Sequence, residues 1–180
     1  LIAQSPPGTY DVILSDAEFV QQLNAAGYIE PLDSNDYPFD DMLHEDFTKF
    51  PGHWSGNTLY SMMVRFGHLG VSYNRKHISD EEAKSYKCFW KPSVKGKVGH
   101  FDWHLPSLGM ISLYNGNGAK LWDLNDGAWK AVQKTTMSLR PQVGGFFDYG
   151  GTFNSLKNGE MVAMCGIGDW ITGVLEKDGA

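Results

Sequence analysis

The chain has 180 residues, of which 42% are hydrophobic and 20% are charged, and its formal net charge at pH 7 is −6. These proportions suit one packed globular domain or one and a fraction. Nucleic acid is excluded as a partner, because no run of lysine or arginine supplies the positive surface that phosphates require. No apolar stretch of the sequence approaches the roughly 20 residues that a membrane-spanning helix needs.

The first third of the chain begins with a strand pattern followed by a helix pattern. Residues 10–14 (YDVIL) carry β-branched residues at their centre and predict a buried strand. Ser15 and Asp16 follow as N-cap candidates, and the helix after them is expected to stop at Gly27. Residues 28–56 are polar, acidic and rich in proline and histidine, which predicts irregular surface chain.

The middle of the chain combines small apolar residues with a helix-start signal. Residues 58–73 predict two short strands that meet at a glycine bend around Gly67 and Gly70. The run from Ser79 to Glu82 has the sequence of a capping box and opens a short helix that is expected to end before Pro92.

The last part of the chain alternates between strand and helix patterns, which predicts an α/β fold with a mainly parallel sheet. The expected elements are, in order, a strand over 97–101, a helix that Asp102 caps, a helix that Asn125 or Asp126 caps and that ends near Pro141, a strand over 145–149, a helix over 152–158 that Gly159 closes, a strand over 161–165 and a last helix that Asp169 caps.

Several segments carry a family resemblance in order and spacing. They are residues 10–16 (YDVILSD) continuing to 26–33 (AGYIEPLD), 67–74 (GHLGVSYN), 85–98 (SYKCFWKPSVKGKV) and 158–164 (NGEMVAM). Together they resemble the type II periplasmic solute-binding proteins of ABC importers, specifically the spermidine- and putrescine-binding type.

The resemblance implies an incomplete bilobal protein of the periplasmic-binding-protein type II fold. Residues 1–66 would be a remnant of the first lobe with a surface loop, residues 67–78 the crossing or hinge, and residues 79–180 the second lobe. It also implies a small-molecule solute, a membrane permease as partner, no cofactor, and a periplasmic location with a signal peptide outside these residues. Open strand edges of a lobe remnant would favour domain swapping or dimerisation.

Three places combine a carboxylate with the start of a helix, where ligands of α/β sheets gather. They are Ser15–Asp16, Asp102–Trp103 and Asp169–Trp170. If they face one cleft, the carboxylates would take the charge of an ammonium group and the indole rings would add cation–π attraction. The alternative interpretation is ordinary helix capping by the aspartates and core packing by the tryptophans.

The resemblance maps part of the family's ligand site onto this sequence. Asp102 lies close to the position of a ligand carboxylate, and Asp16 falls where the family has a ligand-contacting serine. Cys165 replaces a tryptophan that stacks on the polyamine, a role for which Trp170 is the substitute.

Arg65 and Phe66 stand where the family usually has two aromatic residues on the hinge side of the cleft. A guanidinium group binds a carboxylate through a two-pronged pair. This favours a ligand with both an amine and a carboxylate, such as an amino-acid derivative or an opine, and a surface arginine is the alternative.

Other chemistry finds little support in the sequence. An enzyme or sensor on the same bilobal fold, with Asp102 and His104 as an acid–base pair, is the alternative function. The sequence holds no GxSxG motif, and the six histidines include no HExxH or other metal-ligand spacing. Cys88 and Cys165 are expected to be small buried hydrophobic residues, although a disulfide between them stays open.

Overall fold

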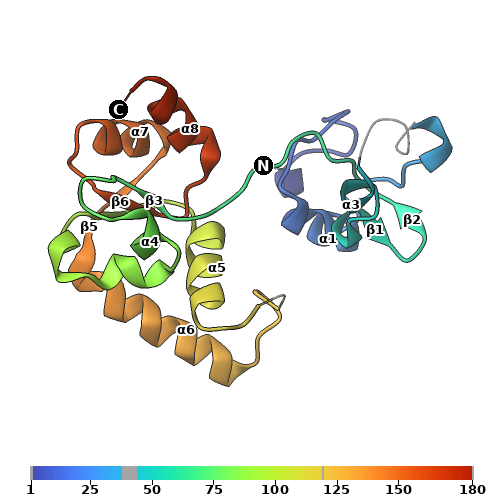
Figure 1. The fold of residues 1–180 in the computed structure, drawn as a ribbon. Helices are drawn as coiled ribbons and strands as arrows, with labels where there is room; N and C mark the ends of the chain where they lie inside the picture. The colour runs from blue at the N-terminus through green and yellow to red at the C-terminus, as the bar shows by residue number, and fades with distance from the viewer. Residues whose placement is uncertain (1, 38–43, 119, 180) are drawn as a thin grey trace. The chain divides into compact units, whose positions relative to one another are not determined.

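The computed structural model describes residues 2–37, 44–118 and 120–179, and it separates into two compact units. The first unit comprises residues 1–66 and the second comprises residues 67–180. Figure 1 shows the order of the elements along the chain. Within the described residues, no helix is both long enough and apolar enough to cross a membrane.

The first unit is built around one helix and a short hairpin. Its described elements are, in order, η1 (Ile2–Gln4), α1 (Ala17–Ala25), η2 (Ser34–Asp36), α3 (Glu45–Thr48), η3 (Pro51–His53), β1 (Trp54–Ser55) and β2 (Thr58–Leu59). The predicted helix is confirmed as α1, with Asp16 as its N-cap residue and Gly27 at φ +69° just beyond its end. The Gln21 side chain fixes α1 to η3 and β1 by donating to the carbonyl oxygens of Gly52 and Trp54 at 3.2 and 2.8 Å.

The strand predicted over residues 10–14 is wrong, because this segment belongs to no strand. Val12 and Leu14 are 87% and 73% exposed. A strand exists only through hydrogen bonds to a neighbour, and none of the described residues pairs with this segment. The β-branched residues of this segment therefore do not form part of a sheet within the described residues.

Two further expectations for this region need correction. Residues 28–56 are not irregular throughout, since η2, α3, η3 and β1 lie there and His53 is buried. The two strands expected within 58–73 exist as β2 and β3 (Ser72–Tyr73), but they do not meet at a glycine bend. Each finds a different partner, because β2 pairs with β1 and β3 pairs with β6.

The described residues of the second unit form a four-stranded sheet in the order β3-β6-β4-β5. Strand β4 (Val98–Phe101) runs parallel to both β5 (Val143–Phe147) and β6 (Ala163–Cys165), and β3 runs antiparallel to β6. The predicted α/β class with a mainly parallel sheet is therefore confirmed. Its helical elements are α4 (Asp80–Ala83), η4 (Tyr86–Trp90), η5 (Pro92–Val94), α5 (His104–Tyr114), α6 (Asp126–Leu139), η6 (Arg140–Gln142), α7 (Tyr149–Lys157) and α8 (Asp169–Lys177).

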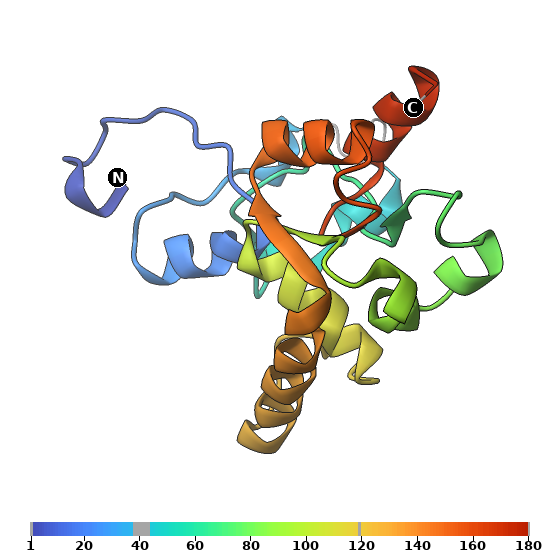
Figure 2. The ribbon, with the colours of Figure 1, turned by 90° about the vertical axis from the view of Figure 1, so that its left-hand side faces the viewer.

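Helices cover both faces of this sheet. Alternate strand residues point to opposite faces, so β4 sends Val98 into the core on the side of α5, α6 and η4, and Phe101 into the core beneath α7 and α8. Figure 1 shows α7 and α8 on one side of the sheet and α5 and α6 on the other. Figure 2 shows the chain rising from α6 through β5 into α7.

Helix starts in the second unit agree with the sequence in two places. The capping box at Ser79 is confirmed, and Asn125 caps α6 by accepting a hydrogen bond from the Ala128 amide at 3.0 Å. The predicted caps Asp102 and Asp169 are wrong, because Trp103 and Gly168 occupy the N-cap positions of α5 and α8. The N-cap residue lies one residue later than predicted before α5 and one residue earlier than predicted before α8.

The boundary between β5 and α7 also differs from the prediction. The strand begins at Val143 and ends at Phe147, and Asp148 caps α7 by accepting a hydrogen bond from the Gly151 amide at 2.7 Å. This cap ends the strand before Tyr149, which the sequence pattern had included in the strand. The strand over 161–165 is confirmed in its last part as β6.

We predict that Glu82→Gln lowers stability above pH 4.5 and has a shrinking effect toward pH 2. Hydrogen bonds from Lys91 and from the backbone and hydroxyl of Ser79 lower the pKa of Glu82 from 4.5 to about 2. A carboxylate with a depressed pKa stabilises the folded state above its unfolded pKa, and this contribution is lost as the pH falls toward the folded value. Chemical denaturation between pH 7 and pH 2 measures the difference between the two proteins.

The matched control is Glu160→Gln, which removes an exposed carboxylate that has no hydrogen bond or ion pair within the described part of the chain. A wild-type advantage over Glu82→Gln that stays constant down to pH 2 would contradict the assigned contacts.

Candidate functional site

Three of the described helices begin at the same edge of the second unit's sheet. Strands β4, β5 and β6 are parallel, so their carboxyl ends lie together, and α5, α7 and α8 follow them. Each crossing from strand to helix carries an aspartate, namely Asp102, Asp148 and Asp169. The carboxyl edge of a parallel sheet is where α/β proteins bind ligands. We call this surface the carboxyl edge.

The ends of β4 and β5 are joined directly. Phe101 lies opposite Phe147 in the register, and the Asp102 amide donates to the Phe147 carbonyl oxygen at 2.8 Å. The buried Phe101 ring lies edge-on between two other aromatic rings, with centroid distances of 6.3 Å to Trp103 and 5.0 Å to Tyr149. The Asp102–Trp103 and Asp148–Tyr149 pairs are therefore neighbours around one buried ring.

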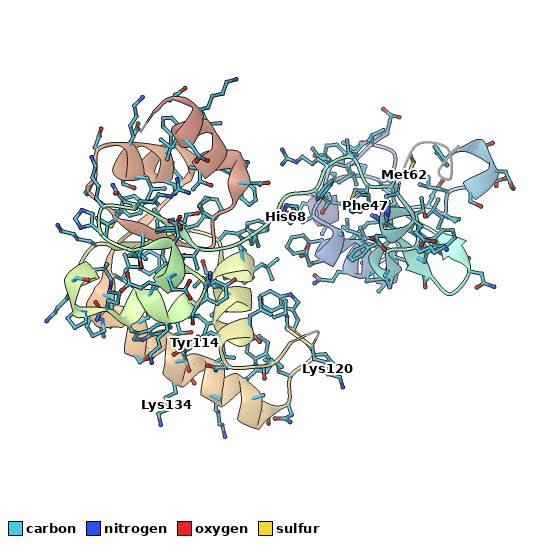
Figure 3. All side chains as sticks on the ribbon, viewed as in Figure 1. Phe47, Met62, His68, Tyr114, Lys120 and Lys134 are labelled. Carbon is cyan, nitrogen blue, oxygen red and sulfur yellow. The ribbon has the colours of Figure 1, made fainter. Side chains whose placement is uncertain are left out.

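The segment that enters the second unit lies against the start of α8. Leu69 forms an antiparallel bridge with Gly168, and the Asp169 amide donates to the His68 carbonyl oxygen at 3.4 Å. The His68 Nδ1 atom lies 3.7 Å from a carboxylate oxygen of Asp169. Figure 3 shows His68 on the connection that leads into the second unit.

A small hollow of about 190 Å³ opens beside this contact. It is lined by His68, Leu69, Gly70, Val71, Ser72, Ile167, Gly168, Asp169 and Thr172. The sequence did not single out the hollow, because its walls come from two segments that are about 100 residues apart and meet only through the sheet.

The three carboxylates of the carboxyl edge differ in their interaction partners. The Asp148 carboxylate accepts a hydrogen bond from the Gly151 amide and so caps α7. Asp102 is exposed, and within residues 2–37, 44–118 and 120–179 its side chain makes no hydrogen bond or ion pair. Asp169 is exposed, and its described side-chain partner is His68. Neither Asp102 nor Asp169 caps a helix, so both carboxylates are available to a cation.

The two tryptophans predicted at this edge are both partly buried. Trp103 contacts Phe101, as described above. The Trp170 indole packs so closely on Gly67 and Gly168 that an added Cβ would lie 3.0 and 2.5 Å from its ring atoms. The Trp170 Nε1 atom is buried and has no hydrogen-bond partner among the described residues. Trp170 thus packs against the connection that leads into β3.

The other predicted site residues belong to the first unit. Asp16 is exposed at the N-cap of α1, where its side chain makes no capping hydrogen bond. Arg65 and Phe66 are both exposed, and the Phe66 ring lies 4.6 Å from the ring of Phe47. The structure thus gathers Asp102, Trp103, Asp169 and Trp170 on one edge of the second unit.

The buried ionisable groups near the sheet favour their neutral forms. Burial lowers the pKa of His100, whose ring stacks 5.5 Å from Phe146. Burial raises the pKa of the Cys88 thiol to about 11 and holds the pKa of the Cys165 thiol well above its ordinary value, so neither is an activated nucleophile. Within the described part of the chain, no cluster of three or more His, Cys, Asp and Glu side chains has metal-binding geometry.

Asp102 and His104, the acid–base pair of the alternative interpretation, flank the N-cap residue Trp103 of α5. His104 is exposed at the first position of α5, and none of the described ion pairs or hydrogen bonds joins it to Asp102.

The family model of the bacterial extracellular solute-binding proteins matches residues 1–180. No curated protein matches the chain in sequence.

Solved structures with the same fold include transporter proteins of three bacteria. A putative spermidine/putrescine ABC transporter from Listeria monocytogenes matches with a TM-score of 0.75 and 18% identity over 92% of this chain and 49% of its own. The spermidine/putrescine substrate-binding protein PotD from Streptococcus pneumoniae matches with a TM-score of 0.67 and 17% identity, over 83% and 45% of the two chains. An ABC transporter protein from Clostridium perfringens matches with a TM-score of 0.59 and 22% identity, over 89% and 48%.

These similarities confirm the predicted type II periplasmic-binding-protein fold. The chain spans about half the length of these solved structures.

We predict that Gly168→Ala destabilises the second unit by roughly 1–3 kcal/mol, the usual cost of overpacking. A Cβ at this position would lie 2.0 Å from the His68 carbonyl oxygen, and this backbone atom cannot move without breaking the Leu69–Gly168 bridge. Chemical denaturation gives the free energy of unfolding, and hydrogen exchange at the Asp169 amide, which donates to the His68 carbonyl oxygen, reports on the bridge.

Gly173→Ala in the same helix is the matched control, because nothing lies within 4 Å of its added Cβ. Alanine there is expected to stabilise α8 by up to about 1 kcal/mol. Equal effects of the two substitutions would show that the close packing of Gly168 on His68 is not present in solution.

Proposed function

Because the chain belongs to the bacterial extracellular solute-binding protein family, we propose that it is part of a protein that captures a small amine-bearing solute. The solute is polyamine-like, or is a zwitterion of the amino-acid or opine type. The protein delivers it to the membrane permease of an ABC importer and works in the periplasm. The protein makes and breaks no covalent bond in its ligand.

The observation that carries this proposal is the state of Asp102 and Asp169. Both carboxylates are exposed at the carboxyl edge, and neither is held by a helix amide. A carboxylate attracts an ammonium group strongly where aromatic walls reduce its contact with water, and Trp103 and Phe101 stand beside Asp102. The net charge of −6 also favours the approach of a cation.

We assign the two units to the two lobes of a solute-binding protein of the kind that closes on its solute by a hinge. Residues 1–66 contribute to the first lobe, residues 67–78 form the crossing, and residues 79–180 contribute to the second lobe. The proposed ligand-binding residues are Asp16, Arg65, Phe66, Asp102, Trp103, Asp169 and Trp170.

The ligand class draws support from the solved structures of the same fold, two of which are described as spermidine/putrescine transporter proteins. Arg65 favours the zwitterionic variant of the proposal, because it is exposed and carries the group that pairs with carboxylates.

Self-association is part of the proposal for this stretch of chain. Val12 and Leu14 expose apolar side chains on a segment of the first unit that pairs with none of the described residues. Such a segment favours pairing with a second copy, as a domain-swapped or truncated dimer. Light scattering over a range of concentrations tests this part separately from ligand binding.

We predict that Asp102→Asn and Asp169→Asn each weaken spermidine or putrescine binding by roughly tenfold to a hundredfold. This range corresponds to the loss of one hydrogen bond to a charged group. Isothermal titration measures the affinity in the protein with all the residues that its gene encodes, and analysis of the recovered ligand tests whether it is chemically unchanged.

Asp178→Asn is the matched control, because Asp178 ends the same helix that Asp169 begins and the charge change is identical. If Asp178→Asn and Asp169→Asn lower the affinity equally, the effect comes from the change in net charge and not from a contact of Asp169 with the ligand. Absence of binding to every amine-bearing compound would refute the proposed ligand class, and a converted ligand would favour the enzyme alternative.

We predict that Arg65→Ala separates the two ligand types. It is expected to leave the affinity for polyamines within about twofold and to lower the affinity for amino-acid or opine ligands by roughly tenfold or more, as loss of a charge-assisted pair requires. Competition titrations with one ligand of each type measure both effects. Undiminished binding of a carboxylate-bearing ligand would remove Arg65 from the site, and Arg140→Ala in the second unit serves as the control.

A further inference from the structure

We infer that Tyr149 is an aromatic contact of the bound solute, with its ring packed against an ammonium group or the methylene chain next to it. This inference rests on the proposed function and adds a residue to the site. The sequence pattern predicts Tyr149 as the last residue of a strand and does not indicate it as a ligand residue.

The position of Tyr149 is fixed by its neighbours on both sides. It is the first residue of α7, directly after the cap Asp148. Its ring lies 5.0 Å from that of Phe101 at an interplanar angle of 70°, an edge-to-face contact. Phe101 is itself 6% exposed and belongs to the core beneath α7 and α8. The Tyr149 ring therefore packs against a residue of the buried core.

The Tyr149 side chain is more accessible than that of Trp170, which is partly buried. Tyr149 is 51% exposed. The Trp170 ring lies against Gly67 and Gly168, and its Nε1 atom is buried. Both residues lie in the first turn of a helix at the carboxyl edge, but Tyr149 is the more exposed of the two.

The charges around Tyr149 favour a cation. Asp148 precedes it in sequence, and the Asp102 backbone is hydrogen-bonded to Phe147, two residues before Tyr149. Asp102 has an uncommitted carboxylate, as described above. A cation held by a carboxylate beside an aromatic ring gains cation–π attraction, equivalent to roughly twofold to thirtyfold in affinity.

Spermidine titrations of four proteins test the assignment, again with all the residues that the gene encodes. The Tyr149→Ala and Tyr149→Leu variants are expected to bind spermidine roughly twofold to thirtyfold more weakly than the wild type. Tyr149→Phe, which keeps the ring, is expected to stay within about twofold. Tyr149→Leu keeps apolar packing on Phe101, so it remains informative if the alanine variant does not fold.

Phe146→Ala is the matched control on β5. Phe146 is 68% exposed and stacks on His100, which belongs to the opposite face of the sheet from Phe101. It is expected to leave spermidine affinity unchanged. Melting temperatures of all variants separate a loss of ligand contact from a loss of folded protein.

The outcomes distinguish this inference from the proposed function. If the wild type binds spermidine and Tyr149→Leu binds equally well, the contact is absent while the proposed function stands. If Tyr149→Phe is as weak as Tyr149→Leu, the hydroxyl group is the contact and the ring assignment is wrong. If the wild type binds neither spermidine nor putrescine, the polyamine function fails first and the inference fails with it.

Discussion

The parallel pairing of β4 with both β5 and β6 decides where every candidate ligand residue of the second unit lies. Three strands that run the same way must release their chains at one edge, and each chain then turns into a helix there. Residues about 20 to 70 positions apart in sequence, such as Asp102, Asp148 and Asp169, are brought to one surface by this register alone. An antiparallel β4–β5 pair would place Asp148 at the opposite edge from Asp102.

Small differences in helix start then give similar aspartates different roles. Asp148 stands at the N-cap of α7 and its carboxylate binds the Gly151 amide. Asp102 precedes the N-cap of α5 by one residue, and Asp169 follows the N-cap of α8 by one residue. A shift of one residue rotates the side chain away from the free amides of the first turn. Asp102 and Asp169, which the sequence offered both as ligand carboxylates and as helix caps, therefore do not cap a helix in this structure.

The elements that the sequence predicted correctly carry their own local signals. Helices α1 and α6 have apolar residues at helical spacing and a polar N-cap, and β4 is a short run of mostly apolar residues that the charged residue Asp102 follows. Residues 10–14 have an equally clear strand pattern but no partner, and a pattern specifies a strand only if another strand is there to pair with it. The sequence also does not show which aromatic side chain is exposed to solvent. Trp170 and Tyr149 both follow an aspartate, and they differ in the residues that pack against their rings.

The carboxyl edge offers both signs of charge to a ligand. Helices α5 and α8 begin without a side-chain cap, so their first amides and their dipoles favour an anionic group. The carboxylates of Asp102 and Asp169, which do not cap a helix, lie at the same helix starts and favour a cation. His100 and Cys165 beneath this edge favour their neutral forms, so no buried charge opposes either preference. Under the proposed function, a zwitterion would use both kinds of group, while a polyamine would use only the carboxylates and the aromatic rings.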